Sequence, residues 1–165
     1  MTAPPAEILS AEALAPRLRA GDQLAGLDLG TKTIGLAVSD GMRTVATPLE
    51  TVRRKKFGAD VARVKALIGE RRLAGWVIGL PVSMSGEEGP RAQSARAFAR
   101  NLSRLDPRPI LLWDERLSTV AAERALLEAD ASRARRAEVI DAVAAAYILQ
   151  GALDRLSVIA REGAE

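Results

Sequence analysis

The sequence predicts an α/β fold in which a mixed five-stranded sheet is flanked by helices. Three apolar runs compatible with strands come first, and after them apolar runs alternate with segments of helical periodicity. Hairpins join antiparallel strands, whereas a strand, a helix and a second strand in succession form a parallel pair. The element order β-β-β-α-β-α-β-α-α therefore gives a sheet that is antiparallel at its start and parallel at its end.

Hairpin connections link the first three predicted strands. Residues 23–29 and 34–39 are apolar runs joined by the turn "GTKT", which contains Gly30, and this pattern is typical of a hairpin. The stretch "TVATPLETV" at 44–52 is the third strand. Its Pro48 has no amide hydrogen to donate to a neighbouring strand, so we expect this strand at an edge of the sheet.

Helices alternate with short buried strands in the rest of the chain. Apolar residues three and four positions apart, such as Val61, Val64 and Ile68, predict the helices. Pro90 suits the first turn of one helix, and Ser118 suits the cap of another. The expected elements are a helix over 58–72, a strand over 75–81, a helix over 90–105, a strand over 110–113, a helix over 118–128 and a final helix over 133–155.

We expect one domain over residues 22–157, preceded by a poorly ordered extension (1–21) and followed by a short tail (158–165). No run approaches the roughly 18 apolar residues that cross a bilayer, so we expect no membrane partner. The N-terminus has no basic leader, and Glu7 and Glu12 interrupt its apolar residues, unlike a signal peptide. These features predict a cytoplasmic protein.

The composition limits any chemistry to carboxylates, hydroxyls, lysines and arginines. The 165 residues include no cysteine and no histidine, which excludes a thiolate or histidine zinc site, a Ser-His-Asp triad and a histidine general base. The formal net charge is +3, with 24 Lys and Arg residues against 21 Asp and Glu residues. This mild positive balance is compatible with an anionic partner.

Carboxylates stand in unusual places in three predicted elements. Asp28 lies within the first apolar strand, Asp114 and Glu115 follow the last strand, and Asp141 interrupts the apolar stretch "VIDAVAAAYIL" of the last helix. Buried carboxylates are costly and repel one another unless a cation lies among them. Without histidine or cysteine ligands, an all-oxygen set selects a hard ion, so the pattern predicts Mg²⁺ or Mn²⁺. Two such ions sharing an aspartate can activate water and stabilise the leaving oxygen of a phosphodiester.

Basic residues near these acids predict contacts with a nucleic-acid backbone. Lys32 follows the Asp28 strand and Arg116 follows Glu115, so each suits a phosphate near the ions. Pairing with a carboxylate is the alternative for Arg116. Further cations form the helical stripe Arg96, Arg100 and Arg104, the run "RRKK" at 53–56, and the group Arg133, Arg135 and Arg136. Such clusters suit either a solvated helix face or a surface that binds backbone without reading bases. Aromatic residues are only 3%, so base stacking is not expected to dominate.

Four stretches, in order, resemble the signature blocks of the YqgF (RuvX-like) family: "GLDLGTKTIGLAVSD", "VIGLP…SGEEG", "WDERLST" and "IDAVAAAYILQGAL". The resemblance covers residues 24–153. It implies an RNase H-like fold and a divalent-metal nuclease that matures the 5′ end of the small-subunit ribosomal RNA precursor. Holliday-junction resolution is the older proposal that the resemblance also carries.

Carried over by position, the resemblance gives Asp28, Glu115 and Asp141 as catalytic and metal-binding residues. In the usual strand order of this fold the last strand lies two places from the first, about 10 Å away. The longer side chain of Glu115 spans that distance better than Asp114, which remains the alternative ligand. The family usually has an arginine where this chain has Thr33, so a basic contact at the hairpin is either missing or supplied by another arginine.

Other functions stay open on the sequence. The same residues suit a resolvase of branched DNA, and a non-catalytic RNA-binding ribosome-assembly factor would keep the acids in structural roles. An actin- or hexokinase-like ATPase also uses an Asp-x-Gly-Thr hairpin, but such proteins need two domains and this sequence shows no second copy. The residues do not decide between RNA and branched DNA or between endo- and exonuclease, and they leave the oligomeric state open.

Overall fold

A six-stranded mixed sheet forms the centre of the computed structural model, which describes residues 4–130 and 133–164, with only the backbone given for residues 130 and 133–138. Its strand order is β1-β6-β5-β2-β3-β4. The antiparallel half contains β2 (Gln23–Leu29), β3 (Thr33–Ser39) and β4 (Ala46–Arg53), and β2 continues into a parallel half with β5 (Leu73–Leu80) and β6 (Ile110–Asp114). The predicted fold class is confirmed, and Pro48 lies in an edge strand as expected.

The structure has one strand more than the five predicted. β1 (Ile8–Leu9) pairs in parallel with the start of β6. The segment around it also forms the short helices α1 (Ala11–Leu14) and η1 (Ala15–Arg17). A strand of two residues is too short to show alternation, so no periodicity marks it in the sequence.

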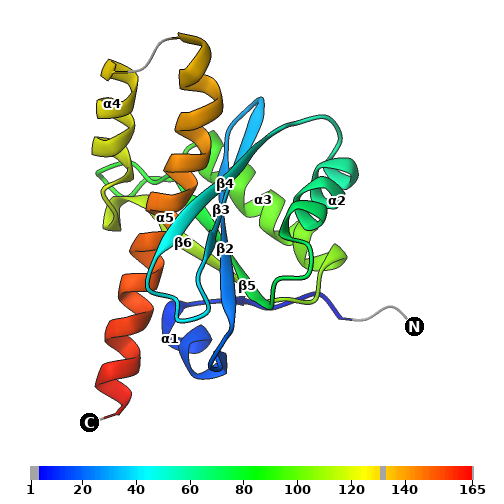
Figure 1. Ribbon diagram of the computed structural model, residues 1–165, viewed down its shortest axis with the longest axis vertical. Coiled ribbons are helices and arrows are strands. Elements are labelled where there is room, and N and C mark those ends of the chain that lie inside the picture. The colour runs from blue at the N-terminus through cyan, green and yellow to red at the C-terminus, as the bar shows by residue number, and fades with distance from the viewer. Residues whose placement is uncertain (1–3, 131–132, 165) are drawn as a thin grey trace.

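Helices cover both faces of this sheet (Figure 1). On one face lie α2 (Phe57–Ile68) and α3 (Pro90–Leu105). Across the other face runs α5 (Arg133–Gly163), and α4 (Val120–Asp130) packs beside it after the short helix η2 (Glu115–Leu117). An apolar layer fills the space between the sheet and the helices on each side.

Alternation along β2 sends its side chains to the two layers in turn. Ala25 and Leu27 join the layer under α2 and α3, whereas Leu24 joins the layer under α5. The same alternation puts Asp28 on the α5 side. The strand therefore delivers a carboxylate to the face that α5 covers, close to the carboxyl ends of the parallel strands.

The last helix is longer than expected, because α5 continues to Gly163 instead of ending at residue 155. By length and composition its stretch Val139–Gly163 could cross a membrane, with a mean hydropathy of 1.3, contrary to the sequence analysis. Half of the apolar 18-residue segment within this stretch is buried in the structure, where side chains such as Ile148 and Leu149 pack on the sheet. Core packing thus accounts for the apolar face of α5.

Candidate active site

Asp28 lies in a buried acidic site at the carboxyl end of β2. Its side chain is only 7% exposed. Arg124 of α4 holds the carboxylate: its Nη2 donates a hydrogen bond of 2.6 Å to Asp28 Oδ1. The negative charge of Asp28 in the apolar strand is therefore balanced by a cation from α4, a helix far along the chain.

The same guanidinium reaches a second carboxylate. Arg124 Nη1 donates to Glu115 Oε1 over 3.0 Å, and the Glu115 side chain is 11% exposed. Glu115 follows β6 directly, and β5 lies between β6 and β2. Gly79 of β5 leaves room for this crossing, because a Cβ built there would lie 2.8 Å from Glu115 Oε2. Acids from strands two places apart thus meet at one cation.

Asp114 is engaged elsewhere. Its carboxylate accepts the backbone N–H of Arg116 and pairs with the Arg116 guanidinium over 2.7 Å. The hydrogen bond from that guanidinium lowers the pKa of Asp114 below its ordinary value. Of the two adjacent acids that the sequence left open, Glu115 is the one that shares a partner with Asp28.

Asp141 approaches the site from α5. The helix comes so close to β3 that a Cβ on Gly35 would collide with the backbone carbonyl of Asp141. Gly35 is also the residue opposite Asp28 in the β2–β3 ladder, so this contact brings Asp141 beside Asp28. The Thr33 hydroxyl donates a hydrogen bond of 2.5 Å to Asp141 Oδ2. Thr33, which stands where the family usually has an arginine, therefore orients the Asp141 carboxylate.

The surroundings of Asp28 shift its pKa. Burial raises the pKa of Asp28 above its ordinary value, and the charges of Glu115 and Asp141 act in the same direction. The charge and hydrogen bond of Arg124 oppose this rise without cancelling it. A carboxylate in this position is stabilised in its charged form by any cation added nearby.

The donor set has the chemistry of a site for a hard divalent ion, although the side chains do not form a finished coordination sphere. Among the described residues, no group of three or more acidic side chains is placed so that it holds a metal ion as it stands. The Arg124 guanidinium lies between Asp28 and Glu115. Carboxylate oxygens are the ligands that Mg²⁺ and Mn²⁺ prefer. Coordination by all three acids requires Arg124 to move.

Residues 22–155 match the family model described as "RuvX: Holliday junction resolvase". The chain belongs to the RuvX family. Two similar proteins are both named "Putative pre-16S rRNA nuclease". The one from Cereibacter sphaeroides is 71% identical over 140 residues, which cover 85% of this chain and 88% of that protein. The one from Ruegeria pomeroyi is 72% identical over 133 residues, which cover 81% of this chain and 86% of that protein.

The fold of this RuvX family member is similar to that of RuvC. The structure described as T. thermophilus RuvC in complex with a Holliday junction substrate matches with a TM-score of 0.50 and 17% sequence identity. The match covers 82% of this chain and 96% of that one. The likeness is one of fold, and it confirms the RNase H-like architecture.

Several of the cations predicted to contact nucleic acid have partners in this RuvX chain. Arg116 pairs with Asp114, and Arg96 pairs with Glu88 over 2.6 Å. The hydrogen bond of that pair lowers the pKa of Glu88. The arginine stripe on α3 is thus in part an ion-paired helix surface.

The other predicted cations lie in different surroundings. Arg104 donates a hydrogen bond to the side chain of Asn101. Lys32, on the β2–β3 turn, and Arg100, on α3, are exposed. The side chains of the group Arg133, Arg135 and Arg136 lie outside the described residues.

Two arginines near the acids were not singled out in the sequence. Arg124 follows the "DERLST" block by a few residues and reads as an ordinary charged position of an amphipathic helix. Arg54 is one of the four cations of the run "RRKK", and nothing in the sequence sets it apart from the others. In the structure its Nη1 donates to the carbonyl of Gly30 over 2.6 Å. The usable signal for Arg124 is its closeness to that block, since a helix that follows it directly must pack near the same strand end.

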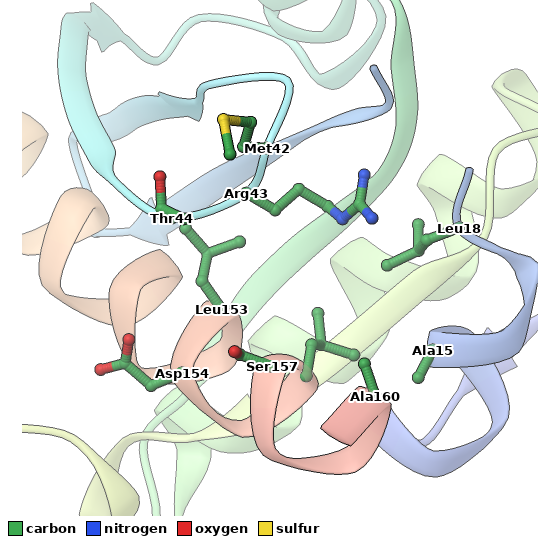
Figure 2. Close-up of a pocket in the computed structure, with 10 residues that line it drawn as sticks. Ala15, Leu18, Met42, Arg43, Thr44, Leu153, Asp154, Ser157 and Ala160 are labelled. Atoms are coloured by element: carbon green, nitrogen blue, oxygen red, sulfur yellow. The ribbon is translucent and has the colours of Figure 1, made fainter. Parts of the chain in front are cut away.

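A surface hollow of about 290 Å³ lies at the end of the sheet opposite to Asp28 and Glu115 (Figure 2). The β3–β4 turn and the C-terminal part of α5 line it, with Met42, Arg43 and Leu153 among its residues. The Arg43 guanidinium donates to the carbonyls of Arg19 and Asp22, so it fastens the turn to the preceding segment. Asp28, Glu115 and Asp141 do not line this hollow.

Proposed function

We propose that this chain is a divalent-metal-dependent nuclease that hydrolyses phosphodiester bonds in the 5′-end maturation of the small-subunit ribosomal RNA precursor, in the cytoplasm. One observation carries the proposal: Asp28 and Glu115 converge on one guanidinium in a buried site that Asp141 adjoins. Well-packed apolar residues usually stabilise a fold as well as such a charged group does, so a role in chemistry better explains it. The names of the relatives in C. sphaeroides and R. pomeroyi, at 71% and 72% identity, support the choice of substrate.

In this proposal Asp28, Glu115 and Asp141 hold Mg²⁺ or Mn²⁺. When bound, one ion or, in the finer form of the proposal, two ions would supply Lewis acidity and would lower the pKa of an attacking water. Thr33 keeps the Asp141 carboxylate oriented. Arg124 neutralises Asp28 and Glu115 in the metal-free protein, and its fork of N–H donors would suit a phosphate of the substrate.

Resolution of branched DNA is the second candidate. The description of the matching family model, a Holliday junction resolvase, favours it. The same three carboxylates serve either substrate, because metal-assisted hydrolysis acts on the phosphodiester and not on the base.

Cleavage of a matched panel of substrates tests these alternatives. The panel contains RNA that spans the 5′ end of the small-subunit precursor, unrelated RNA of the same length, and a four-way DNA junction, each with Mg²⁺, Mn²⁺ or a chelator. We expect cleavage of the precursor RNA to leave 5′-phosphate ends and to stop with the chelator. Products with 3′-phosphate ends would contradict attack by water activated at the metal.

Two variants make the panel specific to the acidic site. Asp28→Asn should abolish cleavage, whereas Asp114→Asn, which changes the acid paired with Arg116, should retain it. Cleavage of the junction alone would establish the resolvase. RNA binding without cleavage, unaffected by Asp28→Asn in a folded protein, would leave a non-catalytic binding factor.

A further inference from the structure

We infer that Arg54 and the groove beside it form a subsite for the sugar–phosphate backbone of the substrate strand, next to the phosphate that is cut. The inference rests on the proposed nuclease function and extends it from the acidic site to the path of the strand. The ligand class is a phosphodiester chain, bound through its charges and not through its bases.

Both the backbone and the side chain of Arg54 are hydrogen-bonded to the β2–β3 turn. Its backbone N–H donates to the carbonyl of Lys32 over 2.8 Å, and its Nη1 donates to the carbonyl of Gly30 over 2.6 Å. The guanidinium carbon lies 5.8 Å from the centre of the Phe98 ring, which packs edge-on against Phe57. These contacts hold the cation in one place before any ligand arrives.

The partners of the Arg54 side chain leave its charge available. A carbonyl and an aromatic ring are the partners that the structure gives it, and no carboxylate is among them within the described residues. The bond to Gly30 uses one of the five N–H donors of a guanidinium. Arg96 and Arg116 differ in this respect, because each pairs with a carboxylate.

The groove next to Arg54 has a volume of about 510 Å³ and a basic lining. Among the described residues that line it, three are charged, all of them cations, and none is acidic or aromatic: Leu29, Gly30, Thr31, Arg54, Lys55, Pro90, Arg91, Ser94 and Ala95. A second hollow, beside β4 and α2, shares Lys55 with this groove but differs in its acids, since Glu50 and Asp60 line it with Arg53 and Arg63. A lining with three cations and no stacking surface suits phosphates better than bases.

The groove lies directly across the turn from the acids. Gly30 follows Asp28 by two residues, a distance of at most about 7 Å along the chain. Asp28 faces the α5 layer, whereas the lining residues Arg91 and Ala95 belong to α3 on the other face. Exposed Lys32 stands on the turn between them. A strand whose scissile phosphate lies at Asp28 therefore places its next phosphates over the turn and in the groove.

The test is binding of one fluorescent single-stranded RNA, and of DNA of the same sequence, over a series of salt concentrations with a chelator present to prevent cleavage. Arg54→Ala should weaken binding of both polymers several-fold and reduce the salt dependence by about one charge. Arg54→Lys should keep that charge in the salt dependence and bind with intermediate affinity. Arg53→Ala is the matched control, because Arg53 is exposed and lines the hollow with Glu50 and Asp60.

Thermal unfolding of each variant shows whether it remains folded. If Arg54→Ala unfolds at the assay temperature, Arg91→Ala tests the same groove without disturbing the turn, because Arg91 lines this groove and not the hollow of Arg53. An equal loss for Arg53→Ala, an unchanged salt dependence, or a loss for one polymer only would overturn the inference. Binding that depends on Arg54 in a protein that never cleaves would instead overturn the proposed nuclease and keep the subsite.

Discussion

Asp28 binds its proton more tightly in the folded protein than in the unfolded chain, because burial raises its pKa. The folded state therefore keeps a proton that the unfolded state has lost, and the free energy of unfolding falls as pH rises from the ordinary value of 3.8 through the raised pKa. At neutral pH the charged carboxylate opposes folding. Asp28→Asn should accordingly raise the melting temperature at pH 7, by about 2–4 °C for each kcal/mol gained.

Thermal unfolding from pH 3 to 8, with a chelator present, measures this effect. The advantage of Asp28→Asn should disappear below about pH 3.8, where the wild-type carboxyl is protonated in both states. Asp114→Asn should instead lower the melting temperature at pH 7. The Arg116 hydrogen bond lowers the pKa of Asp114, so the charged carboxylate stabilises the fold at pH values above the ordinary pKa of an aspartate. A lower melting temperature for Asp28→Asn at pH 7 would show that Arg124 compensates the burial fully.

In the proposed function, a divalent ion would compete with Arg124 for the oxygens that the guanidinium holds, Asp28 Oδ1 and Glu115 Oε1. Arg124→Gln should therefore bind Mn²⁺ at lower concentration than the wild type, as measured by electron paramagnetic resonance of free Mn²⁺. Arg116→Gln is the control, because Arg116 pairs with Asp114 outside the cluster. Weaker or unchanged Mn²⁺ binding by Arg124→Gln would mean that the arginine and the ion use different oxygens.

The sequence predicted which acids converge more easily than which cation meets them. Asp28, Glu115 and Asp141 interrupt or end apolar elements, where a charge is conspicuous. Arg124 lies on a helix whose charged positions look alike, and only the packing of α4 beside α5 turns this one inward. The closeness of α4 to the "DERLST" block predicts that this helix lies near the strand end, but not which of its charged side chains faces the acids. The contacts of Arg124 with Asp28 and Glu115 could therefore not be predicted.

At the scale of elements, the approach of α5 to β3 sets the geometry of the site. Gly35→Ala would place a methyl group against the Asp141 carbonyl and force the helix away from the sheet. Overpacking of this kind typically costs about 1–3 kcal/mol. We expect a lower denaturation midpoint in urea and a loss of nuclease activity larger than the fraction of unfolded protein explains, because Asp141 moves with the helix.

Gly58→Ala provides the matched comparison in the same unfolding and activity assays. Gly58 lies in the first turn of α2, and a Cβ there meets no atom within 4 Å. A helical alanine is favoured over glycine, so this variant should gain about 0.4–1 kcal/mol and keep its activity. If both variants behave alike, the tight contact at Gly35 does not control the position of Asp141.

Element boundaries show where periodicity is informative and where tertiary contacts take over. The β2–β3 hairpin was predicted within a residue, because its two apolar runs are bounded by a recognisable turn. The predicted end of α5 at residue 155 is wrong, because the helix continues to Gly163. Leu156 and Ile159 extend its apolar face and pack with α1 residues such as Leu14, in a segment that was expected to be poorly ordered. The helix continues because that segment gives its last turns a surface to cover.

Across the whole molecule, the two ends of the sheet differ in the charged side chains that gather there. The carboxyl ends of β2 and β6 carry the acids, and the basic groove lies across the adjoining turn. The opposite end is closed by the β3–β4 turn, the N-terminal helices and the last turns of α5 (Figure 1). The net charge of +3 gives no hint of this division, because its arginines are spread along the chain and only the fold separates the paired ones from those in the groove.

The N-terminal segment closes an edge of the sheet far from the acids. β1 pairs with the start of β6, and the amide of Ile110 donates to the carbonyl of Glu7 over 2.9 Å. Deletion of residues 1–9 would leave the backbone of β6 as an open edge, which pairs readily with other chains. We expect a melting temperature lower by about 2–4 °C, for a loss near 1 kcal/mol, and concentration-dependent association in sedimentation velocity.

Nuclease activity per folded molecule should survive this deletion, because Asp114 and Glu115 lie at the other end of β6. Glu7→Gln is the control: it removes only the exposed ion pair with Arg17, and such pairs contribute about 0–1 kcal/mol. If the shortened chain loses activity without losing stability, the N-terminal segment acts on the site itself. If it keeps the association state and melting temperature of the full chain, the two-residue strand does not protect the edge.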